Sequence, residues 1–335
     1  MNSILKLIFW RLLQGLLVLL IVSALTFTLL AAAGGDALTA LQGDPLVSEQ
    51  SLTELRRTYG LDQPLHVRYL RWLGDIARAQ MGQSFFYHAP VGAIIRSRLV
   101  NTLILAALAL GFAWAIALSL GAIAARRDGS WADHLCSAII LLAASTPRIV
   151  LALVALAFAV RTSLFTIGAA ALDERWTARL ARVIVPALVL SVPLVALFLA
   201  QVRDGLRAAL HEEFVQVARA KGLPERVVIL RHALRSALNP LITIFGYSLG
   251  GVVSGSVIVE TVLGWPGLGQ LSVVAVRNRD VPLLMGVVLV TATAVFVGSL
   301  VADILLRLND PRLQREGEGA TAAKTSHAET AMPAG

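Results

Sequence analysis

Long apolar runs separated by short polar segments make up most of the chain. Each run is about long enough to cross a bilayer core as a helix, which takes about 20 apolar residues. The runs extend over residues 12–33, 99–125, 135–160, 183–202, 240–262 and 282–306. The pattern predicts an all-α polytopic membrane protein with six transmembrane helices.

The first run follows two basic residues, Lys6 and Arg11. Basic residues accumulate on the cytoplasmic side of membrane spans, so residues 1–11 are predicted to be cytoplasmic and residues 12–33 to be the first transmembrane helix. A cleaved signal peptide ending at residues 31–33, Ala-Ala-Ala, is the alternative. The apolar core of a signal peptide is only about 7 to 15 residues long, so we expect a retained helix.

Residues 34–98 are mixed in polarity and predict a helical extracytoplasmic insertion. Residues 51–54, Ser-Leu-Thr-Glu, can cap a short helix that Gly60 closes. A second helix is expected from Pro64 to Arg78, with one face formed by Tyr69, Leu70, Leu73 and Ile76. The arginines of this insertion do not contradict its placement, because the positive-inside rule loses force in loops beyond about 60 residues.

The remaining charges orient the transmembrane core, residues 99–306. Residues 126–127, Arg-Arg, end the second run, and Arg203 ends the fourth. The polar segment 203–239 is therefore predicted to be a cytoplasmic loop. The tail over residues 314–335 has few apolar side chains, so we expect it to be cytoplasmic and disordered.

Composition supports the membrane class and narrows the chemistry. The chain is 57% hydrophobic and 15% charged, with a mean hydropathy of +0.74, whereas soluble domains carry about 25% charged residues. The net charge of +8 comes from basic residues scattered beside the apolar runs, which predicts contacts with lipid and no nucleic-acid partner. The histidines show no metal-ligand spacing, and Cys136 lies alone in an apolar run. Neither a metal site, a disulfide nor catalysis is expected.

Nucleotide chemistry is also not expected on this chain. A P-loop needs a lysine directly after a glycine, so that the lysine reaches the phosphates from a glycine-rich turn. None of the three lysines, Lys6, Lys221 and Lys324, follows a glycine. Energy from a nucleotide would have to come from a partner protein.

The loop over residues 203–239 predicts two short helices separated by residues 221–224, Lys-Gly-Leu-Pro. Gly222 is typical of a helix end and Pro224 of a helix start. The second helix has an apolar stripe at helical spacing, formed by Leu223, Val227, Leu230, Leu234 and Leu238. Such a helix could lie on the anionic inner leaflet or contact a partner protein.

Residues 218–223, Ala-Arg-Ala-Lys-Gly-Leu, resemble the cytoplasmic signature of permease subunits in bacterial ABC importers. The generic signature is Glu-Ala-Ala, three residues and then Gly, and only Ala218 and Gly222 match it. The form found in peptide permeases matches over the whole run. Other segments resemble the same permeases, in order: residues 61–64, 69–73, 101–103, 231–235, 260–262, 265–269, 278–280 and 310–312.

The likeness covers roughly residues 10–315 and identifies the B-type permease of dipeptide, oligopeptide and nickel importers. It implies the type I ABC importer permease fold, a bacterial inner-membrane location with cytoplasmic termini, and a periplasmic position for residues 34–98. The chain would form half of a translocation pathway for peptides. Nickel or another small solute remains the alternative substrate.

The same resemblance implies partners for the chain. These are a second permease subunit, two ATP-binding subunits that hold ATP and Mg²⁺, and a periplasmic substrate-binding protein; this chain itself would bind no cofactor. The pore partner could be a different chain or a second copy. The ATPase-coupling segment would comprise Gln216, Val217, Ala218, Arg219, Ala220, Lys221, Gly222 and Leu223. A glycine at the turn lets two backbones approach, and Arg219 and Lys221 can pair with acids on the ATPase.

The fifth run contains two GxxxG spacings, formed by Gly246 with Gly250 and Gly251 with Gly255. Such spacings let membrane helices pack closely, so these glycines are predicted to be packing residues. The run would face the second permease subunit and line the pathway. Ser248 and Ser254 could then add polar lining, although a buried serine commonly bonds its own helix backbone.

Charged residues inside the runs require an explanation, because they are costly in a membrane. Arg148 follows Pro147, where a kink is expected. The resembled family has a Ser-x-Pro motif here, which Ser145 and Pro147 match, but its next residue is apolar or small. Arg148 departs from this pattern. We hypothesise that Arg148, with Ser145 nearby, lines the pathway and attracts an anionic group such as a peptide carboxylate. An ion pair with an acid of this chain or its partner is the alternative.

Glu260 and Asp303 are expected near the ends of their spans, in structural pairs. Acids within spans are also typical of proton relays, so a proton-coupled secondary transporter is a rival class. A membrane scaffold without a pathway is a further alternative.

Overall fold

The computed structural model describes residues 3–32, 50, 53–54, 60, 62–126, 128–162 and 176–309. Within these ranges the chain is helical, and the extended pairing found there is one isolated bridge between Gln83 and Pro90. The all-α prediction is therefore confirmed. The predicted tail over 314–335 and most of residues 33–61, with part of the predicted capping box, lie outside the described residues.

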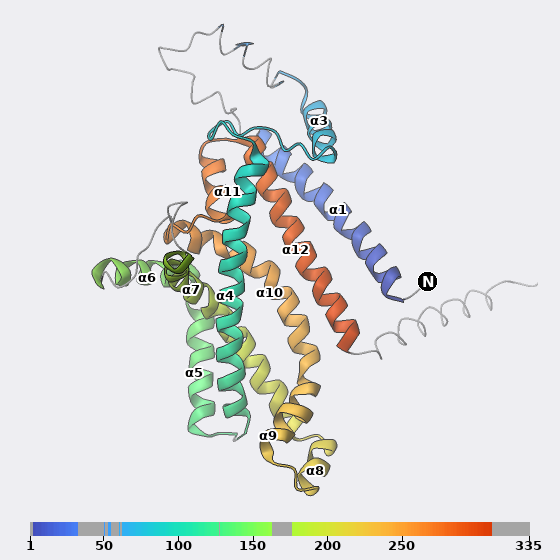
Figure 1. Cartoon of the computed structure of the whole chain (residues 1–335), viewed down its shortest axis with the longest axis vertical. Helices are drawn as coiled ribbons and strands as arrows, with labels where there is room; N and C mark the ends of the chain where they lie inside the picture. The colour runs from blue at the N-terminus through green and yellow to red at the C-terminus, as the bar shows by residue number, and fades with distance from the viewer. Residues whose placement is uncertain are drawn as a thin grey trace, which may run out of the picture.

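Four continuous helices are long and apolar enough to cross a membrane: α1 (Ser3–Ala32), α4 (Val91–Ala125), α7 (Trp176–Leu210) and α12 (Val281–Asn309). Two further spans are bent, namely α5 (Trp131–Ser145) with α6 (Arg148–Thr162), and the two halves of α10 (Leu234–Val262). The predicted number of six holds if each bent pair counts as one span. Figure 1 shows α4 and α5 side by side, with α12 and α1 diverging from them.

The third apolar run bends more sharply than the kink that the sequence predicted at Pro147. The α5 and α6 helices meet at an angle of 97°. Thr146 has extended backbone angles (φ −89°, ψ 119°) because the ring of Pro147 disfavours the helical conformation in the residue before it. A break therefore replaces the expected kink. In Figure 1, α6 projects sideways from the bundle.

Several helices begin before their apolar runs. The α1 helix starts at Ser3 and not at Leu12, and α4 starts at Val91 and not at Leu99. The first turns of α4 are held by packing, since Val91 and Ile95 are buried in a cluster with α11 (Leu268–Arg277) and α12. The α4 helix therefore extends into the segment that the polarity pattern assigned to the insertion.

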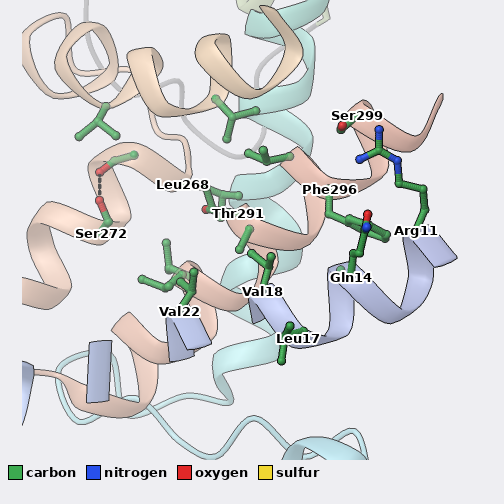
Figure 2. Close-up of a pocket in the computed structure, with 18 residues that line it drawn as sticks. Arg11, Gln14, Leu17, Val18, Val22, Leu268, Ser272, Thr291, Phe296 and Ser299 are labelled. Carbon is green, nitrogen blue, oxygen red and sulfur yellow. Dashed lines mark hydrogen bonds between the residues drawn. The ribbon is translucent and has the colours of Figure 1, made fainter. Parts of the chain in front are cut away.

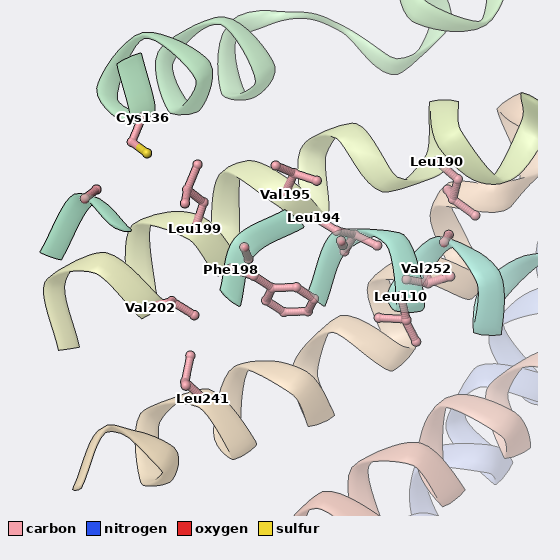
Figure 3. Packing of buried hydrophobic residues seen from close by; sticks show 14 of the residues in the cluster. Leu110, Cys136, Leu190, Leu194, Val195, Phe198, Leu199, Val202, Leu241 and Val252 are labelled. Atoms are coloured by element: carbon pink, nitrogen blue, oxygen red, sulfur yellow. The ribbon is translucent and has the colours of Figure 1, made fainter. Parts of the chain in front are cut away.

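The core lies between α4, α7 and α10 (Figure 3). Phe198 of α7 is fully buried and stacks on Trp114 of α4, with ring centroids 4.7 Å apart. Small residues on α4 allow close approach, and a side chain on Gly121 would overlap Val202 of α7. Close packing of small residues stabilises helix pairs where lipid offers no hydrophobic driving force between them.

The insertion contains the predicted second helix, α3 (Leu65–Ala77). Tyr69 anchors it to α1 through its hydroxyl, which lies 2.9 Å from Ser23 Oγ, and its ring packs on Phe27 at 5.6 Å. The predicted apolar face is wrong at Leu70, which is 63% exposed. Tyr69 is directed toward α1, so Leu70, the next residue around the helix, faces away from it.

A groove of about 830 Å³ separates α1 from α10, α11 and α12 (Figure 2). Its lining is mostly apolar, with Arg11 and Gln14 of α1 at one end. At that end Arg11 forms an ion pair with Asp303 of α12, with 2.7 Å between Nη2 and Oδ2. The structural pairing predicted for Asp303 is confirmed. Phe296 of α12 fills the space beside Gly15, so α1 contacts the bundle at this level.

The polar segment 203–239 is more helical than predicted. The α7 helix continues past Arg203 to Leu210, and α8 (Glu213–Ala220) follows it. After the turn, α9 (Glu225–Val227) continues through a π-helical segment, η2 (Val228–Ala233), directly into α10. The second short helix is thus the beginning of α10. Figure 1 places α8 and α9 at the end of the molecule opposite α3 and α11.

Candidate docking turn and polar residues of the membrane core

The turn at Gly222, between α8 and α9, ends α8 as the sequence predicted. Gly222 has φ +76°, and its N–H donates to Arg219 O at 2.9 Å. The N–H of Leu223 donates to Ala218 O at 3.4 Å. This pair of bonds is a Schellman motif, which requires a left-handed residue where glycine now lies. A side chain at position 222 would meet nothing within 4 Å, so the glycine is needed for its conformation and leaves the turn open to a partner.

A two-point ion pair fastens the same turn. Arg219 donates from Nη2 to Glu225 Oε1 at 2.7 Å and from Nε to Oε2 at 3.2 Å. The hydrogen bond from Arg219 holds the pKa of Glu225 below its ordinary value, against the effect of partial burial. The sequence led us to expect that Arg219 pairs with a partner protein, and the structure shows it engaged within its own chain. Lys221 remains exposed.

The two faces of α8 differ in burial. Val215 and Ala218 are buried against the rest of the chain, whereas Phe214 is 44% and Val217 is 53% exposed. Leu223 on the turn is 37% exposed. Large apolar side chains gathered on the outer face of a short helix are typical of a binding surface. We call Phe214, Val217, Leu223 and the turn at Gly222 the docking face.

An ion-pair cluster holds the adjoining helix ends together. Arg207 of α7 lies 3.0 Å from both Asp133 of α5 and Asp128 of the preceding linker. Arg203 lies 3.5 Å from Asp133 and donates to Ser137 Oγ at 2.7 Å. Asp133 also accepts from the N–H of Gly129 at 3.1 Å. The end of α7, from which α8 emerges, is thus tied to the start of α5.

At the opposite end, α4 and α10 supply the missing N-terminal cap of α11. Gly267, at the start of α11, has no side chain to accept the first N–H groups. Thr102 Oγ1 of α4 accepts the Leu268 N–H at 2.8 Å, and Glu260 Oε2 of α10 accepts the Gln270 N–H at 3.1 Å. Glu260 is fully buried, and side chains at Gly267 or Gly269 would overlap its carboxylate. A carboxylate at a helix N-terminus is also favoured by the helix dipole.

Two further hydrogen bonds complete this arrangement. Asn101 Nδ2 donates to Pro266 O at 2.7 Å, and Trp265 Nε1 donates to Asn101 O at 3.1 Å. Trp265 is 1% exposed. We call Asn101, Thr102, Glu260 and Trp265 the clasp, because together they join α4, α10 and α11.

Asp280 performs a similar role at the other end of α11. Its side chain is fully buried and accepts from Ser84 Oγ at 2.6 Å, from the Phe86 N–H at 3.0 Å and from the Leu283 N–H at 3.1 Å. Ser84 and Phe86 belong to the insertion, and Leu283 to the first turn of α12. Asp280 therefore fixes the insertion to the α11–α12 corner.

Comparison with known proteins identifies the family. Residues 117–315 match the model of the binding-protein-dependent transport system inner membrane component, and residues 4–106 match the model of the N-terminal part of such components. The chain belongs to this family of transport permeases. Its membrane nature and its place in an ABC importer family follow.

Relatives cover nearly the whole permease. A protein of Brucella ovis named as a peptide permease is 36% identical over 310 residues, 91% of this chain and 97% of its own. An oligopeptide transport system permease of Bacillus subtilis is 34% identical over 91% of this chain and 98% of its own. A di/tripeptide transport system permease of Pseudomonas aeruginosa is 32% identical over 88% of this chain and 94% of its own length.

The clasp unites segments that the sequence matched to the family one by one. Residues 101–103, 260–262 and 265–269 meet in it, and residues 278–280 contribute Asp280 at the other end of α11. Sequence reasoning placed Glu260 in a structural pair, and the structure supplies hydroxyl and backbone donors in place of a cation. The signal that could have found this is the two glycines, Gly267 and Gly269, which leave room for a buried acid.

The candidate pathway residues of this permease lie in different environments. Ser145 is exposed at the end of α5, beside the break. Ser248 is 2% exposed and donates to Phe245 O at 2.7 Å in its own helix. The side chain of Ser254 lies outside the described part. Arg148, the first residue of α6, is half-buried, and its guanidinium occupies the space that a side chain at Gly255 would need.

The four glycines of α10 serve different contacts. A side chain at Gly246 would overlap Ala302 of α12, and one at Gly250 would press on Val295 at 3.0 Å. This pair therefore packs α10 on α12 within the chain. Gly251 meets nothing within 4 Å, so the predicted packing role is not found for it inside the chain. Gly255 receives Arg148 and not a packed helix backbone.

Proposed function

We propose that this permease is a membrane-spanning subunit of an ATP-driven importer and forms half of the pathway for peptides. The observation that carries the proposal is its likeness to relatives named as peptide permeases, at 32% to 36% identity over about nine tenths of the chain. The chain itself transports and does not hydrolyse ATP. Separate ATP-binding subunits hold ATP and Mg²⁺.

The docking face is the contact with the ATP-binding subunit. Its apolar side chains, Phe214, Val217 and Leu223, are exposed, and Lys221 beside them can pair with an acid of the ATPase. The Arg219–Glu225 pair and the α7–α5 ion-pair cluster make the turn a firm extension of α7 and α10. Movement of the ATPase at the docking face is thereby transmitted to two spans of the bundle.

This assignment sets the orientation. The docking face and the N-terminal end of α1 are cytoplasmic, and the insertion with α3 and α11 is periplasmic. Lys6 and Arg11 before the first span and Arg203 and Arg207 at the end of α7 agree with that orientation. A periplasmic substrate-binding protein meets the insertion, and a second permease subunit completes the pathway.

Proton coupling is disfavoured by the positions of the acids. Asp303 is paired with Arg11, and the Glu260 carboxylate is enclosed by Thr102 and the first turn of α11. The buried Glu260 lacks the access to water that a proton relay needs, and the charge of Asp303 is balanced by Arg11.

Reconstitution tests the function. This permease, its second permease subunit, the ATP-binding subunits and the binding protein are placed in proteoliposomes, and uptake of labelled tripeptide is followed. ATP-dependent accumulation that requires the binding protein is expected. Accumulation driven by a proton gradient without ATP, or transport of Ni²⁺ but of no peptide, would refute the proposal.

A further inference from the structure

The break between α5 and α6 brings a positive charge against α10. Arg148 is the first residue of α6, and its guanidinium lies over Gly255, where any larger residue would collide with it. The glycine thus makes room for a cation beside the helix backbone. The arrangement depends on the 97° bend at residues 146–147, since a straight third span would carry residue 148 away along its own axis.

This charge lacks a partner in the part of the chain that the structure describes. Arg148 makes no hydrogen bond and no ion pair with a described residue. By contrast, Arg11, Arg203 and Arg207, at the ends of spans, all face carboxylates. The N-terminal end of α6 carries partial positive charge of its own, which adds to the cost of a cation there.

The depth of Arg148 makes the missing partner significant. The apolar part of α5, residues 135–145, rises about 17 Å, so Arg148 lies just past the middle of a hydrocarbon core of about 30 Å. A charge at such depth is tolerated where it faces water or an opposite charge. We therefore expect the half-buried side chain to face water or an opposite charge when the transporter opens outward.

The guanidinium of Arg148 favours a solute that carries a carboxylate. A guanidinium is a planar fork of N–H donors that matches a carboxylate in a two-point contact. It repels divalent metal cations, which bears on the choice between peptide and nickel. Every peptide with a free C-terminus carries a carboxylate.

The geometry points to Arg148 as a specificity-determining residue that contacts the carboxylate of a peptide in the outer half of the pathway. Gly255 leaves the space that the guanidinium of Arg148 occupies. This inference rests on the proposed function in peptide import. It gives the permease a substrate preference of its own, in addition to that of the binding protein.

The test compares two peptides in the reconstituted full transporter, trialanine and trialanine amide, at concentrations that load the binding protein equally. Arg148→Gln should lower the initial uptake rate of trialanine by about 10-fold or more, the effect of losing a charged hydrogen bond, and change that of the amide little. Gly255→Ala displaces the guanidinium without removing it and should weaken the same preference. Arg161→Gln, which removes a charge from the far end of α6, is the matched control.

Three results would overturn the inference. Arg148→Gln could slow both peptides equally, which would mean that the guanidinium does not recognise the carboxylate. It could release the second permease subunit from the purified complex, which would identify an ion pair between subunits. If the wild-type transporter moves neither peptide in the presence of ATP, the proposed function fails first and the inference fails with it.

Discussion

Thr102 donates its hydroxyl hydrogen to Glu260 at 2.9 Å and accepts the Leu268 N–H at 2.8 Å, so one side chain of α4 links α10 to the start of α11. The link lies at the start of α11, where that helix meets α4 and α10. Asp280 holds the other end of α11 to the insertion. A force applied to the insertion by a binding protein would therefore reach α10 and α12 through short, buried hydrogen bonds.

Removal of the clasp carboxylate should destabilise the permease. Glu260→Ala leaves the Thr102 hydroxyl and the Gln270 N–H without an acceptor inside the protein, at about 1 to 3 kcal/mol for each buried group. The thermal unfolding temperature of the purified complex should fall, and Glu260→Gln, which keeps one acceptor oxygen, should lower it less. Thr261→Ala is the control, because that exposed hydroxyl bonds only its own helix at Val257 O. Equal unfolding temperatures for Glu260→Ala and the control would show that the clasp contributes no stability.

Substitution of the docking glycine should uncouple transport from ATP hydrolysis. Gly222→Asp forces a side chain into a left-handed backbone at φ +76° and adds a negative charge to the docking face. Membrane insertion should be normal, while copurification of the ATP-binding subunit and peptide-stimulated ATPase activity should be lost. Gly82→Asp is matched, with φ +77° and only Pro282 near a side chain at that position, at 3.8 Å, and it lies in the insertion. Normal transport by the Gly222→Asp variant would contradict the docking assignment.

The Arg219–Glu225 pair should stabilise the docking turn in a pH-dependent way. Because the pKa of Glu225 in the folded chain is lowered from 4.5, the pair contributes fully above that value and is lost as the pH falls through the lower folded pKa. Both side chains are nearly half exposed, so the contribution is about 1 kcal/mol or less and weakens with salt. Hydrogen exchange of the amides of residues 219–225 measures it.

The comparison is between wild type and Glu225→Gln at pH values above and below the transition. Faster exchange in the variant is expected near neutral pH, and the two proteins should converge in acid. The charge-swapped double variant, Arg219→Glu with Glu225→Arg, should restore protection. A difference that persists in acid would show that the ion pair is not its source.

The glycines of α10 should respond to substitution according to their neighbours. Gly246→Ala places a methyl group on Ala302 of α12, and overpacking of this kind costs about 1 to 3 kcal/mol. Gly251→Ala meets open space and should leave the unfolding temperature of the isolated permease unchanged. If Gly251→Ala instead weakens copurification with the second permease subunit, that face of α10 belongs to the subunit interface. Equal destabilisation by both variants would refute the assignment of neighbours.

The sequence alone determined the class of the molecule, the helical nature of its spans and the position of the turn at Gly222. Hydropathy is a local property, and the runs are long enough to be recognised without their neighbours. The turn at Gly222 was predicted because a helix end with a left-handed residue requires glycine, and because residues 218–223 carry the resemblance to peptide permeases.

Only the tertiary structure decided which polar residues meet. Glu260 and Thr102 are separated by 158 positions, and Ser84 and Asp280 by 196, so no local pattern reveals either hydrogen bond. Arg219 was expected to reach for a partner protein, and folding brought Glu225 within its reach instead. The sequence located the break at Pro147, but the angle of the break and the contact of Arg148 with Gly255 follow from packing between helices.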